Sequence, residues 1–184
     1  FETVYLALFI SAVLYNYVYT LNAITDITAD KINKPDRPLP SGKLPYNIAM
    51  LYLVFLIVVA IVGIILLFKG KSMIMAFLVL IIGGIYSLPP FELKNIPILA
   101  SFITGWGLVH PIFITGDLDI VWLIAVILTL YATGTALLKD LSDLHGDRQE
   151  GRALTANFIS MKNLMLVSMG MTLAAALLCL MLDH

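Results

Sequence analysis

The sequence has few charged side chains and almost no cysteine. Lysine, arginine, aspartate and glutamate make up 12% of the 184 residues, about half of the share that is typical of globular domains. One cysteine, Cys179, excludes an intramolecular disulfide and a cysteine-based zinc cluster. Hydrophobic residues reach 60%, and the mean hydropathy is +0.97. This composition predicts an all-α fold, a polytopic transmembrane helix bundle.

Long uncharged stretches alternate with polar segments. A membrane-spanning helix needs roughly 20 apolar residues, and six stretches qualify: residues 3–25, 46–68, 72–88, 96–114, 120–138 and 163–182. Helices are expected because they satisfy their own backbone hydrogen bonds in lipid. Pro97 and Pro111 predict a kink or a break in the fourth stretch. We expect one integral membrane domain over residues 1–184, truncated at its start because the first residue is Phe1.

The connecting loops differ in length and in charge. Residues 69–71 and 115–119 form tight turns, whereas loops 26–45 and 139–162 are long and polar. Six spans place both long loops and the 89–95 connection on one face of the membrane. That face carries every basic residue except Lys69 and Lys71. The positive-inside rule therefore predicts that the long loops are cytoplasmic.

The first long loop follows a periodic polar pattern, "NAITDITAD". Asn22, Asp26 and Asp30 are four residues apart, so they form one stripe if the helix continues for two more turns. Tyr15 and Tyr19 lie one turn apart beside this stripe, and either face a cavity or pack between helices. A solvated charged loop is the alternative explanation, and the following "KPDRPLPSGK" is equally consistent with a rigid turn that ends a helix.

The second long loop repeats this spacing. In "KDLSDLHGD", Lys139, Asp143 and Asp147 are again four residues apart. Asp140 adds a carboxylate, and its counterpart in the first copy is Ala23. Two matched copies on one membrane face argue against charges that are merely solvated.

Two acidic clusters repel each other unless a cation lies between them. Mg²⁺ prefers oxygen ligands and keeps part of its coordination shell for substrate phosphates. Nearby basic residues such as Lys31, Lys34, Arg37 and Lys94 can neutralise further phosphate oxygens, and arginine can do so through two hydrogen bonds. The predicted ligand is therefore a diphosphate held between two metal-bearing walls.

These motifs resemble those of the UbiA superfamily of intramembrane prenyltransferases. The first family signature, N-D-x-x-D-x-x-x-D followed by R-P-x-x-S-G, corresponds to "NAITDITAD" and "RPLPSG" here. The second signature, D-x-x-x-D, corresponds to "DLHGD", and the family's Tyr-Ser-x-Pro-Pro connection corresponds to "YSLPPFELK". Ala23 departs from the family pattern, which usually has aspartate at that position.

The resemblance implies that this chain is a fragment. Family members have nine spans, with the signatures after the second and the sixth. The six spans here look like spans two to seven, so the chain is expected to be incomplete at both ends.

The resemblance also implies an activity and a set of site residues. Family members transfer a prenyl group from an isoprenoid diphosphate to a lipophilic acceptor, with Mg²⁺ as cofactor, two ions being expected here. The implied catalytic residues are Asp26, Asp30, Asp143 and Asp147, which with Asp140 are also the metal ligands. The implied diphosphate contacts are Asn22, Arg37, Tyr86, Lys94 and Lys139.

The implied acceptor is either an aromatic quinone precursor or a lipid of the geranylgeranylglyceryl phosphate type, since "KDLSDLHGDR" looks closest to the motifs of enzymes that use these two acceptors. Haem O and chlorophyll synthases also belong to the superfamily. The alternatives are a membrane terpene cyclase or diphosphatase, and a cation transporter. Transporters usually place ionisable residues near the membrane midplane, whereas the span centres here carry no acidic residue. A catalytically inactive scaffold is the third alternative.

Overall fold

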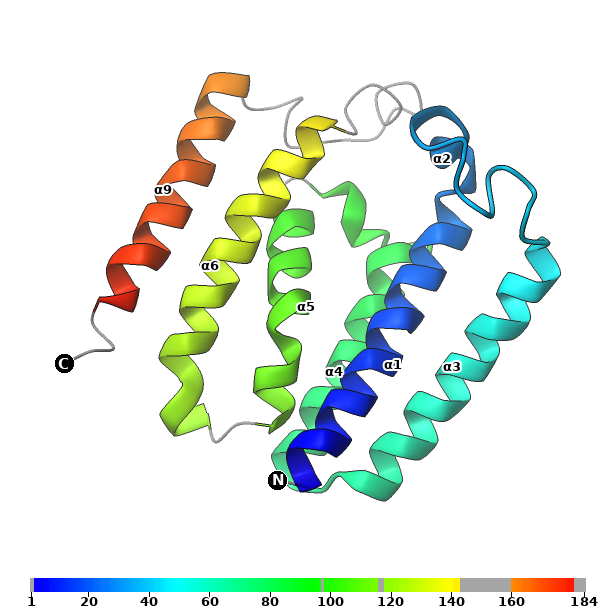
Figure 1. Ribbon diagram of the computed structural model, residues 1–184, viewed down its shortest axis with the longest axis horizontal. Coiled ribbons are helices and arrows are strands. Elements are labelled where there is room, and N and C mark those ends of the chain that lie inside the picture. The colour runs from blue at the N-terminus through cyan, green and yellow to red at the C-terminus, as the bar shows by residue number, and fades with distance from the viewer. Residues whose placement is uncertain (1, 97, 116–117, 143–159, 181–184) are drawn as a thin grey trace. The chain divides into compact units, whose positions relative to one another are not determined.

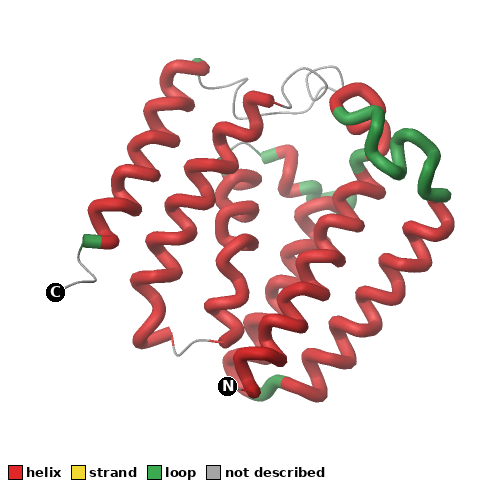
Figure 2. The backbone as a smooth tube through the Cα atoms, viewed as in Figure 1, coloured by secondary structure: helices red, strands yellow, loops and turns green. Residues whose placement is uncertain are grey.

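The computed structural model describes residues 2–96, 98–115, 118–142 and 160–180. Within these ranges the chain is helical and contains no strand (Figures 1 and 2). The elements are α1 (Glu2–Thr25), α2 (Ile27–Asn33), α3 (Tyr46–Leu67), α4 (Gly70–Ser87), the 3₁₀ turn η1 (Leu93–Asn95), α5 (Leu99–Thr115), α6 (Leu118–Ser142) and α9 (Met161–Cys179). They form two compact units, Phe1–Glu92 and Leu93–His184.

All six predicted apolar stretches are helices, and five of them are long and apolar enough to cross a membrane: α1, α3, α4, α6 and α9. The sixth helix, α5, has 17 residues and begins at Leu99 rather than at the predicted residue 96. It is preceded by Ile98, whose φ of 65° lies outside the right-handed helical region. Pro111 lies inside α5 without ending the helix, so the predicted break does not occur there.

In the first unit, α1 packs against both α3 and α4. Tyr17 and Leu21 of α1 form a buried cluster with Leu53 and Leu56 of α3. The buried positions of α3 recur every three or four residues and so form one stripe. Its remaining surface is also apolar, with Leu66 74% exposed, as expected for a helix whose outer face contacts lipid.

In the second unit, α6 packs against α5 on one side and α9 on the other. The Ser168 hydroxyl of α9 donates a hydrogen bond of 2.7 Å to the Gly134 carbonyl of α6. Both residues are small, which allows the two backbones to approach closely, as is common between membrane helices.

Candidate functional site

The polar site of the first unit lies where α1 ends. Asp26 separates α1 from α2, with φ −101° and ψ 12°, so the helix is interrupted there. The helical hydrogen bonds nevertheless continue across it: the Asp26 amide donates to the Asn22 carbonyl at 2.9 Å, and the Asp30 amide donates to the Asp26 carbonyl at 2.8 Å. Asn22, Asp26 and Asp30 therefore keep the spacing of a helix stripe, as the sequence pattern indicated.

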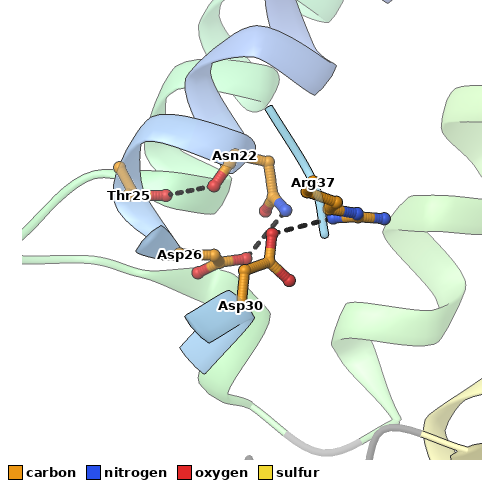
Figure 3. A network of polar contacts seen from close by, with 5 residues as sticks. All are labelled: Asn22, Thr25, Asp26, Asp30 and Arg37. Atoms are coloured by element: carbon orange, nitrogen blue, oxygen red, sulfur yellow. Dashed lines mark hydrogen bonds and ion pairs between the residues drawn. The ribbon is translucent and has the colours of Figure 1, made fainter. Parts of the chain in front are cut away.

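Both carboxylates of this stripe are buried and hydrogen-bonded. Asp26 is 8% exposed and Asp30 is 5% exposed. The Asn22 side-chain amide donates to Asp26 Oδ2 at 2.7 Å, and Arg37 Nη1 donates to Asp30 Oδ2 at 2.8 Å (Figure 3). Because a buried carboxylate is costly without a partner, each contact offsets part of the cost of burying its carboxylate. The alternative of a solvated charged loop does not describe Asp26 or Asp30.

A compact turn after α2 carries Arg37 back to the stripe. The Leu44 amide donates to the Pro38 carbonyl at 2.8 Å, and Gly42 has a φ of +75°, a conformation that other residues rarely adopt. The prediction that "KPDRPLPSGK" forms a turn is therefore correct, and the same turn also contacts the acidic stripe. The turn supplies the guanidinium that pairs with Asp30.

Ser87, at the end of α4, also belongs to this network, although the sequence analysis did not select it. Its hydroxyl donates to Asn22 Oδ1 at 3.4 Å, and the side chain is fully buried. The neighbouring candidate, Tyr86, lies on the last turn of α4 and is half-buried. The only available signal for Ser87 was its place in "YSLPPFELK", since its partner is 65 residues away in the sequence.

A cavity of about 510 Å³ adjoins the acidic stripe. Asp30, Arg37, Tyr19 and Ala23 are among the residues that line it. Tyr19 also stacks on Tyr15, one turn earlier in α1, with ring centroids 6.1 Å apart, so the prediction of a cavity-facing side chain holds for Tyr19. The remaining lining residues are Thr20, Pro38, Leu39, Pro40, Leu44, Ile48, Ala49 and Tyr52.

The other predicted site residues belong to the second unit. Lys94 is half-buried in η1. Lys139 and Asp140 lie in the last turns of α6, which continues beyond the predicted end of its span; Asp143 and Asp147 lie outside the described residues. The second acidic cluster therefore stays a prediction.

The first cluster offers two carboxylates, which are the type of ligand that Mg²⁺ takes in proteins. The described residues contain no group of three or more histidine, cysteine, aspartate and glutamate side chains that could hold a metal. Mg²⁺ does not require such a group, since it is usually bound by one or two carboxylates together with water and substrate phosphates. Asp26 and Asp30 meet that requirement.

The chain is a multi-pass integral membrane protein, since five of its described helices are long and apolar enough to cross a membrane. Its polar site lies at a helix end, where a pair of buried carboxylates follows α1. Residues 1–183 match the UbiA prenyltransferase family. The chain belongs to this family, which confirms the resemblance seen in its motifs.

Comparisons with known proteins agree with this assignment. The chain is 31% identical over 172 residues to the probable homogentisate phytyltransferase 2, chloroplastic, of Oryza sativa subsp. japonica, covering 86% of this chain and 45% of that protein. It is 33% identical over 163 residues to the digeranylgeranylglyceryl phosphate synthase of Methanococcus aeolicus, covering 86% of this chain and 56% of that protein. The chain thus spans about half the length of these relatives.

A solved structure confirms the predicted fold class. The UbiA homolog from Archaeoglobus fulgidus bound to GPP and Mg²⁺ superposes with a TM-score of 0.79 at 19% sequence identity. The match covers 97% of this chain and 65% of that one.

Proposed function

We propose that the protein containing this chain transfers a prenyl group from an isoprenoid diphosphate to a lipophilic acceptor within the membrane, with Mg²⁺ as cofactor. The observation that carries the proposal is the buried pair Asp26 and Asp30 at the end of α1, with Arg37 bound to Asp30. Family membership supports it, as do relatives that are named as prenyltransferases.

The first wall of the proposed site is formed by Asp26 and Asp30, which would hold one Mg²⁺ ion. When bound, the ion neutralises the diphosphate and makes it a better leaving group. Arg37, whose side chain is 46% exposed, places a positive charge near the diphosphate oxygens. Asn22 holds Asp26 through the hydrogen bond to Oδ2.

From the second sequence motif, we propose that Asp140, Asp143 and Asp147 would hold a second Mg²⁺ ion. Lys139 precedes Asp143 by four residues in the sequence, and we propose that it contacts the diphosphate, together with Tyr86 and Lys94.

In the reaction, the bond between the allylic carbon and the diphosphate oxygen breaks, and the electron pair leaves with the diphosphate. The allylic carbon, which gains carbocation character, forms a bond with a carbon or oxygen atom of the acceptor, and the acceptor loses a proton. The prenyl chain lies in the apolar interior, where each buried CH₂ contributes about 0.8 kcal/mol.

The acceptor is an aromatic quinone precursor or a glyceryl phosphate lipid. One relative is named a homogentisate phytyltransferase and another a digeranylgeranylglyceryl phosphate synthase, so the comparisons support both classes. The charge distribution of the loops supports a cytoplasmic location for the acidic clusters.

The proposal is tested with the full-length protein and radiolabelled geranylgeranyl and farnesyl diphosphates. Each donor is incubated with aromatic and glycerol-phosphate acceptors, with Mg²⁺ or with excess chelator, and the lipid products are separated. We expect a labelled acceptor adduct that requires Mg²⁺ and is abolished by Asp143→Ala. Full activity of Asp143→Ala would remove the second metal wall from the proposal.

Incubation with the donor alone separates transfer from the enzymatic alternatives. A cyclised hydrocarbon or free prenyl alcohol as the main product, with no adduct for any acceptor, would indicate a cyclase or diphosphatase. Transport is disfavoured by the position of Asp26 and Asp30, since both follow the end of α1 rather than lying at its centre.

A further inference from the structure

The end of α4 is packed unusually closely against α1. A Cβ atom added to Gly83 would lie 2.6 Å from Val18 Cγ2, and one added to Gly84 would lie 3.0 Å from the Tyr17 hydroxyl oxygen. Both distances are shorter than ordinary van der Waals contact. The two glycines therefore permit an approach of α4 to α1 that larger residues would prevent.

This approach places the Ser87 hydroxyl next to Asn22. Ser87 follows Gly83 and Gly84 by one helical turn, so it lies on the same side of α4. It is fully buried, and its hydroxyl donates to Asn22 Oδ1 at 3.4 Å. The serine is thus held beside the acidic stripe by the packing of the α4 glycines against side chains of α1.

The Asn22 side chain connects Ser87 to Asp26. An ionised carboxylate can only accept hydrogen bonds, so the NH₂ end of the Asn22 amide must face Asp26, as the 2.7 Å contact shows. The carbonyl end then faces Ser87. The reverse orientation would place the Asn22 oxygen against the carboxylate. A hydroxyl donor at position 87 therefore favours the orientation that holds Asp26.

We propose that Ser87 is a positioning residue of the metal site, which acts on Asp26 through Asn22. The inference rests on the proposed function, since it assigns Asp26 to a divalent cation. Groups that orient metal ligands typically change metal affinity by about 10–100-fold. Because the Ser87 contact is long, we expect Ser87→Ala to weaken affinity by roughly threefold to tenfold, at or below the lower end of that range.

The test measures Mn²⁺ binding to the purified full-length protein by electron paramagnetic resonance, without substrate. Asp26→Asn identifies the part of the isotherm that belongs to this site. Ser87→Ala is expected to weaken that part, whereas Ser168→Ala is the matched control, since it also removes a buried hydroxyl that donates one hydrogen bond but belongs to the other unit. Circular dichroism confirms that each variant retains its helices.

A double-mutant cycle distinguishes positioning from packing. Asn22→Ala removes the connection, so Ser87→Ala should have no further effect on Mn²⁺ affinity in that background. Equal Mn²⁺ affinities of the wild type and Ser87→Ala would overturn the positioning role of Ser87 and leave the metal assignment of Asp26 in place. An undiminished effect of Ser87→Ala in the Asn22→Ala background would also overturn it. Absence of an Asp26-dependent Mn²⁺ site in the wild type would instead remove the metal assignment on which both proposals rest.

Discussion

Asp26 and Asp30 lie one helical turn apart and are similarly buried, and the hydrogen bonds that they accept from Asn22 and Arg37 differ in kind. Asp26 accepts a hydrogen bond from Asn22, a neutral side chain on the same helix. Asp30 accepts one from Arg37, a charged side chain on the following turn (Figure 3). The Asn22 amide is itself held by Ser87, whereas the Arg37 side chain is nearly half exposed.

This difference suggests different roles for the two carboxylates. The Asn22 side chain is neutral, so its hydrogen bond orients the Asp26 carboxylate without competing with a cation for its charge. The partner of Asp30 is a cation, so a metal ion and Arg37 compete for the same carboxylate. We therefore expect Asn22 to support metal binding and Arg37 to oppose it until a diphosphate is present.

The largest effect is expected from removing either carboxylate charge. Asp26→Asn and Asp30→Asn should each reduce prenyl transfer by about 100-fold or more, because each loses a metal ligand that neutralises the leaving group. The measurement is the initial rate of adduct formation in the full-length protein at saturating Mg²⁺. Asp36→Asn, an exposed aspartate after α2, is the control and should retain activity. Near-normal rates for Asp26→Asn would show that Asp26 is structural only.

Arg37→Gln is expected to have a smaller effect, which strengthens the binding of Mn²⁺ and weakens the binding of the prenyl diphosphate. Without the arginine, Asp30 loses its competing cation, so Mn²⁺ should bind several-fold more tightly in the absence of substrate. The KM for the prenyl diphosphate should rise by roughly tenfold or more, because hydrogen bonds to charged groups contribute about 1.5–3 kcal/mol.

Arg37→Lys keeps the charge and should lie between the wild type and Arg37→Gln in both measurements. Lys43→Gln removes an exposed cation from the same loop and is the matched control for a general change of charge. Weaker Mn²⁺ binding by Arg37→Gln would contradict the proposed competition, since it would mean that the arginine supports the metal site.

The smallest effect is expected for Ala23→Asp, which introduces the residue that the family usually has. Ala23 lines the same cavity as Asp30 and Arg37, so a carboxylate there would be near the proposed cation. In this solvent-accessible setting the added attraction is about 1 kcal/mol, which corresponds to a roughly fivefold increase in Mn²⁺ affinity. Isothermal titration calorimetry of the two proteins would measure it. Unchanged affinity would place Ala23 outside the metal site.

The helices could be predicted from the sequence because each apolar stretch is long enough to cross a membrane and must satisfy its own backbone in lipid. One boundary that the sequence misplaced was the start of α5. Hydropathy includes Ile96 and Ile98 in the span, but Ile98 has a positive φ, and hydropathy carries no information about backbone dihedrals. The stripe of Asn22, Asp26 and Asp30 could also be predicted, because residues four apart lie on one side of a helix. This holds even though the helix is interrupted at Asp26.

By itself, the sequence determined the membrane class, the position of the apolar helices and the family, because these depend on composition, length and local spacing. Only the tertiary structure decided which partner each carboxylate has. The turn after α2 brings Arg37 to Asp30, and the close packing of α4 against α1 brings Ser87 to Asn22. Neither contact follows from local periodicity, since each depends on how the chain folds back on itself.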